Sequence, residues 1–184
     1  MWREPLAGNK GEGMHPTNLS TQRQRIAELA RSKPGTALFL LHHVIDLEWM
    51  REACELTRKD GATGIDGVTA DEYELNLESN LLDLLERIKS GRYKAPPVRR
   101  TYIPKADGSQ RPLGIPTFED KVAQRVIAMV LEAVYEQDFR SCSYGFRPRR
   151  SAHGALEELF SAITWRRQHW VLDVDIRKYL DIAS

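Results

Sequence analysis

Apolar residues recur along this chain at the spacing of amphipathic helices, in several separate stretches. Each stretch follows a Ser, Thr or Asp, residue types whose side chains cap the free N–H groups at the start of a helix. The pattern therefore predicts helices capped by Ser20, Asp46, Thr69, Thr117 and Ser151, of which the first four end near Ala30, Arg58, Ser90 and Phe139. The last helix is expected to turn Leu156, Leu159, Phe160 and Ile163 inward.

Two stretches between the helices have the composition of β-strands. Residues 98–104 and 111–115 flank Asp107-Gly108, a dipeptide that favours a tight hairpin turn. A third strand is predicted at residues 170–176, where the apolar residues are nearly continuous, as in a strand buried on both faces. Such a strand needs neighbours, because alone it leaves its backbone groups unpaired. Helices with a hairpin and a buried strand predict an α+β fold.

Charge is distributed unevenly, although the formal net charge is only +1. Residues 87–111 contain eight Lys or Arg and a single Asp, and residues 140–150 contain four Arg and no acid. Such asymmetry predicts a basic face for a polyanion. The alternative is an ordinary solvated surface.

The composition excludes several other classes of protein. Hydrophobic residues make up 41% and charged residues 29% of the 184 residues, which is typical of a globular chain. No apolar run approaches the roughly 20 residues that span a bilayer, so no membrane association is expected. The two cysteines, Cys54 and Cys142, have neither metal-binding spacing nor a disulfide framework. We therefore expect a cytoplasmic protein.

Two carboxylates, Asp173 and Asp175, lie in the predicted strand at residues 170–176. Strand alternation would place both on the same face. A buried carboxylate must be paired, hydrogen-bonded or bound to a metal in order to stay charged, and Mg²⁺ is a frequent partner at strand ends. The alternative is a carboxylate that bonds to a neighbouring loop.

Four sequence blocks together resemble the bacterial group II intron-encoded reverse transcriptases. In chain order they are GIDGVT at residues 64–69, YIPKADGSQRPLGIPT at residues 102–117, SYGFRPRRSAH at residues 143–153, and the stretch around Asp175. The resemblance covers residues 64–181 and is specific, because four blocks occur in the family's order. It implies the fingers and the start of the palm of a right-hand polymerase, preceded by a helical N-terminal extension.

The resemblance implies a role for each matching residue. Asp175, with the backbone carbonyl of Ile176, would be the catalytic ligand of Mg²⁺ in a two-metal site. Lys105 and Arg111 would hold the triphosphate of the incoming dNTP; an ordinary exposed hairpin lysine is the alternative for Lys105. Leu180 would underlie the nucleotide sugar where the family usually has an aromatic residue, which predicts weaker exclusion of ribonucleotides.

A second set of residues is implied to contact the template or primer. These are Gly64, Gly67, Arg99, Arg100, Phe146 and Arg147. For the glycine-rich loop the alternative is a plain connector. For Phe146 it is a side chain that holds its own loop in the core.

The expected organisation has three parts: a flexible N-terminus at residues 1–18, the helical extension at 19–95, and incomplete fingers and palm at 96–184. The expected function is that of a fragment of an RNA-directed DNA polymerase and maturase of a mobile intron. The expected partners are intron RNA, an RNA/DNA template-primer, dNTPs and a separately encoded C-terminal half. The sequence holds no Tyr-x-Asp-Asp tetrapeptide, which in this family supplies further metal ligands, so this chain alone is expected to be inactive. The alternatives are an intron-RNA-binding module without polymerase activity, or a nonfunctional remnant.

Overall fold

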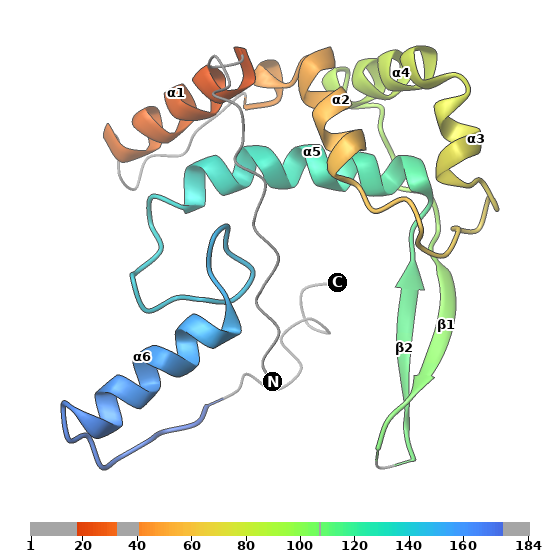
Figure 1. Cartoon of the computed structure of the whole chain (residues 1–184). Helices are drawn as coiled ribbons and strands as arrows, with labels where there is room; N and C mark the ends of the chain where they lie inside the picture. The colour runs from red at the N-terminus through yellow and green to blue at the C-terminus, as the bar shows by residue number, and fades with distance from the viewer. Residues whose placement is uncertain (1–17, 33–40, 107, 175–184) are drawn as a thin grey trace, which may run out of the picture. The chain divides into compact units, whose positions relative to one another are not determined.

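The structure, a computed structural model, describes residues 18–32, 41–106 and 108–174. These residues form helices and one two-stranded antiparallel sheet, which confirms the α+β class (Figure 1). In chain order the elements are α1 (Asn18–Ser32), the 3-10 helix η1 (Leu41–Val44), α2 (Leu47–Leu56), α3 (Ala70–Glu74), α4 (Leu77–Lys89), β1 (Arg99–Pro104), β2 (Gln110–Ile115), α5 (Phe118–Tyr135) and α6 (Ala152–Thr164).

The contacts divide the chain into two compact units, Met1–Asp138 and Phe139–Ser184. The first unit contains α1 to α5 and the hairpin, and the second contains α6. Throughout the described residues, no helix combines the length and the apolar character that crossing a membrane requires. The three-part organisation expected from the sequence remains a prediction.

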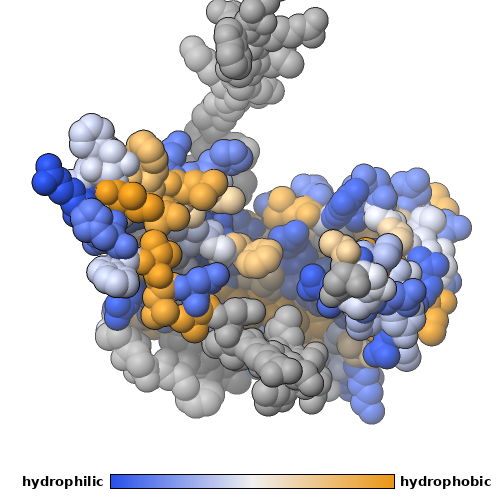
Figure 2. Space-filling model, turned by 90° about the horizontal axis from the view of Figure 1, so that it is seen from below, coloured by the Kyte–Doolittle hydropathy of each residue, from blue (hydrophilic) through white to orange (hydrophobic). Residues whose placement is uncertain are grey.

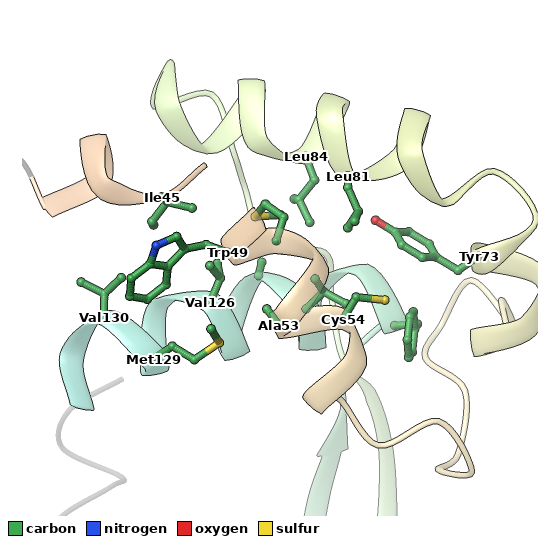
Figure 3. Packing of buried hydrophobic residues seen from close by; sticks show 14 of the residues in the cluster. Ile45, Trp49, Ala53, Cys54, Tyr73, Leu81, Leu84, Val126, Met129 and Val130 are labelled. Atoms are coloured by element: carbon green, nitrogen blue, oxygen red, sulfur yellow. The ribbon is translucent and has the colours of Figure 1, made fainter. Parts of the chain in front are cut away.

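Helix α5 is the centre of the first unit, since α1, α2 and α3 all pack against it. Its buried face presents Val122, Val126 and Met129, each at most 3% exposed. Figure 3 shows Trp49 of α2 directed toward this face, while Leu81 of α4 points toward α2 from the other side. The hydrophobic core is therefore a stack of three helical layers, with α2 between α4 and α5.

Hydrogen bonds at the start of α2 connect this helix to α1. Asp46 caps α2 as predicted, because its side chain accepts a hydrogen bond from the backbone N–H of Trp49 at 3.1 Å. Its second oxygen accepts one from the side-chain amide of Gln22, on α1, at 3.2 Å. The indole N–H of Trp49 in turn donates to the Gln22 side-chain oxygen. The buried indole is thus satisfied, and the same contacts attach α1 to α2.

The predicted helix from Thr69 to Ser90 is two helices. Thr69 caps α3 as predicted and forms a capping box with Glu72, whose carboxylate accepts a 2.9 Å hydrogen bond from the Thr69 backbone N–H. That bond lowers the pKa of the Glu72 carboxyl. The chain then breaks at Leu75 and Asn76, and α4 ends before Gly91, whose φ of +69° only glycine adopts without strain.

Two expectations for the second unit are wrong. Residues 170–174, predicted as the start of a buried strand, are not in a strand, and Trp170 and Leu172 are 96% and 88% exposed. No described strand lies beside them to accept their backbone hydrogen bonds. The apolar face of α6, expected to be buried, is also exposed; its members are Leu156, Leu159, Phe160 and Ile163. In the first unit, α1 begins at Asn18 rather than after Ser20.

Adjacent leucines on α4 test this core. Leu81 is 0% and Leu82 is 48% exposed. We expect Leu81→Ala to lower the free energy of unfolding by about 2–5 kcal/mol, because it leaves a cavity among packed side chains. Leu82→Ala, the same change one residue away, should cost less than about 1 kcal/mol. Urea unfolding followed by circular dichroism measures both, and equal losses would contradict the described packing.

Candidate nucleic-acid interface

The hairpin of β1 and β2 separates the basic residues that the sequence places side by side. In its register Arg99 lies opposite Ile115, Arg100 opposite Gly114 and Ile103 opposite Arg111. Because side chains alternate along a strand and paired residues share a face, Arg99 and Arg111 lie on one face of the hairpin. Arg100 lies on the other face.

Lys105 lies on the same face of the hairpin as Arg99 and Arg111. Its backbone N–H donates to the carbonyl of Ser109 at 2.7 Å, which extends the ladder by one pair beyond Pro104. Its carbonyl accepts a 3.0 Å bond from the N–H of Gly108, whose φ of +79° closes the turn. Two residues after Ile103, Lys105 shares the face of Arg111. We call Arg99, Lys105 and Arg111 the basic face of the hairpin.

The side chains of the basic face are exposed, and no ion pair involves them among the residues that the structure describes. Figure 2 shows mostly hydrophilic surface over the hairpin, in contrast to the apolar surface gathered along α6. Three cations without acidic partners attract phosphate oxygens, which a guanidinium can bind with two parallel hydrogen bonds.

Polar contacts hold the segment that precedes the hairpin against helix α5. Arg87 of α4 donates to Glu119 of α5 at 2.8 Å and lies over the ring of Tyr93. The hydroxyl of Tyr93 donates to the buried carboxylate of Asp120 at 2.8 Å. Burial raises the pKa of the Tyr93 hydroxyl well above its usual range, and the bond to Asp120 adds to this effect. These contacts hold the segment that leads into β1 against the start of α5.

The glycine-rich loop at residues 61–68 packs on the same end of α5. A Cβ atom at Gly64 would lie 2.5 Å from the Cα atom of Thr117 and 2.7 Å from its backbone N. Gly64 is therefore required for a close backbone approach. Gly67 has φ +71° with open space around it, so its requirement is conformational. The ammonium of Lys121 also binds this loop, donating to the carbonyl of Ala62 at 2.8 Å.

In the second unit, the side chain of Arg147 is buried and that of Phe146 is exposed. The guanidinium of Arg147 is buried, donates to the carbonyls of Arg140 and Ser143 at 2.8 Å each, and lies over the ring of Phe139. Phe146 is fully exposed, with a positive φ of 54°. In this conformation Arg147 organises the loop, and Phe146 is the side chain presented to solvent. Template contact by either residue remains a prediction.

The predicted catalytic and sugar-binding residues Asp175, Ile176 and Leu180 lie outside the described residues. Asp173 is described, exposed and not part of a strand. Among the described residues, no three His, Cys, Asp or Glu side chains come together as a metal-binding group. The proposed Mg²⁺ site therefore remains a prediction from sequence.

Sequence reasoning missed a basic cavity beside the glycine-rich loop. Lys121 and Arg125 line an open cavity of about 430 Å³ between the end of α2 and the polar side of α5. Their spacing of four residues puts them on one side of a helix, a signal that was present in the sequence. It was missed because cations on a polar helix face are usually only solvated.

Comparison with known proteins identifies relatives for most of the chain. No protein-family model matches it. Over 170 residues, 89% of the chain, it is 35% identical to protein YkfC of Escherichia coli. It is 40% identical over 119 residues to the group II intron-encoded protein LtrA of Lactococcus lactis, and 35% identical over 66 residues to the mitochondrial nuclear intron maturase 1 of Arabidopsis thaliana. The matches span 45%, 19% and 9% of these relatives, less than half of each.

The two glycines of the loop can be tested against each other. We expect Gly64→Ala to lower the free energy of unfolding by about 1–3 kcal/mol, because the new methyl group overlaps the backbone of Thr117. Gly67→Asn should cost less, at most about 1 kcal/mol, because the positive φ is its only source of strain and asparagine adopts such a φ more readily than most other residues. Thermal and urea unfolding of both variants make the comparison. If Gly64→Ala is as stable as the parent chain, the close approach to Thr117 is not present.

Proposed function

The chain is homologous to group II intron-encoded proteins and intron maturases, and from this relationship we propose that it binds the phosphates of intron RNA through the basic face of its hairpin. The observation that carries the proposal is the position of Arg99, Lys105 and Arg111 on one hairpin face. These cations are exposed and make no ion pair within the described part of the chain.

The electrostatics of RNA binding support this choice of face. Each phosphate neutralised by Lys or Arg releases counterions, which supplies affinity without sequence specificity. The basic face carries three cations, whereas the opposite face carries only Arg100 between residues 99 and 115. The contacts of Arg87 and Tyr93 with α5 hold the segment that leads into β1 against the start of that helix.

We further propose that the whole protein is an RNA-directed DNA polymerase of the mobile-intron type. In this proposal Lys105 and Arg111 bind the triphosphate of a dNTP, since both are phosphate-binding groups on the same face. Mg²⁺ binding by Asp175 and the carbonyl of Ile176 belongs to the same proposal, and its support is the chemistry of the ligands and the resemblance of the surrounding sequence. Phe146, exposed on a loop that Arg147 organises, is proposed to stack on an unpaired template base.

An RNA-binding module without polymerase activity is the second candidate, because the basic face requires no catalytic residue. Primer extension on a homopolymer template with dNTPs and Mg²⁺ separates the two candidates. Incorporation that is lost in Asp175→Asn supports the polymerase. RNA binding without incorporation, even when a polypeptide that carries a Tyr-x-Asp-Asp turn is added, supports the module.

Arg111 and Arg100 form a matched pair for testing the binding face. Each substitution to Gln removes one positive charge from an exposed position of the same hairpin, on opposite faces. We expect Arg111→Gln to make the slope of log affinity against log salt shallower by about one, because one phosphate contact is lost. If the basic face alone binds RNA, Arg100→Gln should leave the slope near that of the parent chain; a shallower slope for Arg100→Gln would instead support the template contact that the sequence resemblance implies for this residue.

Filter binding of a structured intron RNA across a salt series measures these slopes. A flat salt response of the parent chain would sink the proposal that it binds RNA phosphates. A steep parent response with equal slopes for the two variants would retain RNA binding but reject this face of the hairpin.

A further inference from the structure

An open cavity of about 430 Å³ lies between the C-terminal end of α2 and the polar side of α5. Its lining includes Thr57, Arg58 and Gly61 from the α2 side, and Lys121, Gln124 and Arg125 from α5. Three of these six residues are cations, and no carboxylate from the described part of the chain lines the cavity. Its chemistry is therefore suited to an anion.

The three cations differ in how far their charge is already balanced. Arg58 binds Asp60 through two hydrogen bonds, of 2.5 and 3.1 Å, so a carboxylate already offsets its charge. Lys121 donates a hydrogen bond to the backbone carbonyl of Ala62, which is neutral, and an ammonium group has three donors. Lys121 therefore keeps its full charge and further donors for a ligand.

Arg125 has no acidic partner within the described parts of the chain. It is exposed and lies one helical turn beyond Lys121. Like charges four residues apart on a helix repel each other, so this pair is unfavourable in the free protein. An anion bound between the two groups would attract both and so offset that repulsion.

We propose that Lys121 and Arg125 bind a backbone phosphate of an RNA strand in this cavity. The cavity borders the glycine-rich loop, because Gly61 lines it and the carbonyl of Ala62 accepts the Lys121 hydrogen bond. A strand that passes over the loop therefore meets both cations. This inference rests on the proposed RNA binding and adds to it a second phosphate contact, on the helical body rather than on the hairpin.

The loop also sets the position of the lysine. Gly64 fixes the loop against Thr117, and Thr117 caps the helix that carries Lys121 and Arg125. Loop and cations thus belong to one packed structure, and the ammonium is held in place before any ligand arrives. Such preorganisation lowers the entropic cost of binding.

Filter binding of the whole chain to a structured RNA, across a salt series, tests the site. The double variant Lys121→Gln/Arg125→Gln should make the slope of log affinity against log salt shallower by about one, because the bound phosphate loses its cations. Lys121→Arg/Arg125→Lys keeps both charges and should bind RNA within about twofold of the parent chain, because nonspecific phosphate binding depends mainly on charge.

The matched control is Arg51→Gln/Arg92→Gln, which also removes two positive charges. These arginines are in exposed ion pairs with Glu78 and Glu86, away from the cavity lining. We expect the control to keep the parent slope. Circular dichroism and thermal unfolding of every variant show whether a loss of binding reflects a loss of folding.

Three outcomes would overturn the inference, and they are distinguishable. A parent chain whose RNA binding does not respond to salt overturns both the proposed function and this site. A steep parent response with equal slopes for the cavity and control variants rejects the site alone. A cavity variant that loses stability but keeps the parent affinity shows that Lys121 and Arg125 serve the fold.

Discussion

The close approach of Gly64 to Thr117 is the contact on which the rest of the arrangement depends. At this point the glycine-rich loop meets the residue that caps α5, and Thr117 lies two residues after the end of β2. One backbone contact therefore sets the loop, the hairpin and the central helix relative to one another. A side chain at residue 64 would force at least one of the three to move, because the overlap is with backbone atoms.

Buried polar contacts reinforce this junction more than the surface ion pairs do. The carboxylate of Asp120, 3% exposed, accepts hydrogen bonds from Tyr93 at 2.8 Å and from Gln124 at 2.9 Å. It lies in the first turn of α5, where the helix dipole favours a negative charge. The ion pair of Arg51 with Glu78 is exposed, and such pairs contribute about 0–1 kcal/mol. Removal of Tyr93 or Asp120 would thus leave a buried polar group without its partner.

The sequence predicts the structural features that depend on neighbouring residues. It does not predict features that depend on packing between residues far apart in the chain. The caps Asp46, Thr69 and Thr117 were confirmed, because each bonds within its own first turn. The hairpin was predicted because strand composition and a turn dipeptide suffice. The division into α3 and α4, and the exposure of residues 170–174, depend on packing that no local pattern contains. The sequence motif alone implies a role for Gly64. Its contact with Thr117 joins segments 53 positions apart and is visible only in three dimensions.

The basic residues of the chain differ in whether a carboxylate already pairs with them. Arg87 and Arg92 lie in the basic stretch that suggested a polyanion, yet both have carboxylate partners. The cations of the hairpin's basic face, and Lys121 and Arg125 on α5, have none among the described residues. A cation that is paired within the protein must lose that partner before it can bind a phosphate, whereas an unpaired one loses only water. Arg99, Lys105 and Arg111 lie on the hairpin, and Lys121 and Arg125 lie beside the glycine-rich loop; these two segments meet at Thr117. The junction between loop, hairpin and α5 therefore also positions the two surfaces that are proposed to bind RNA.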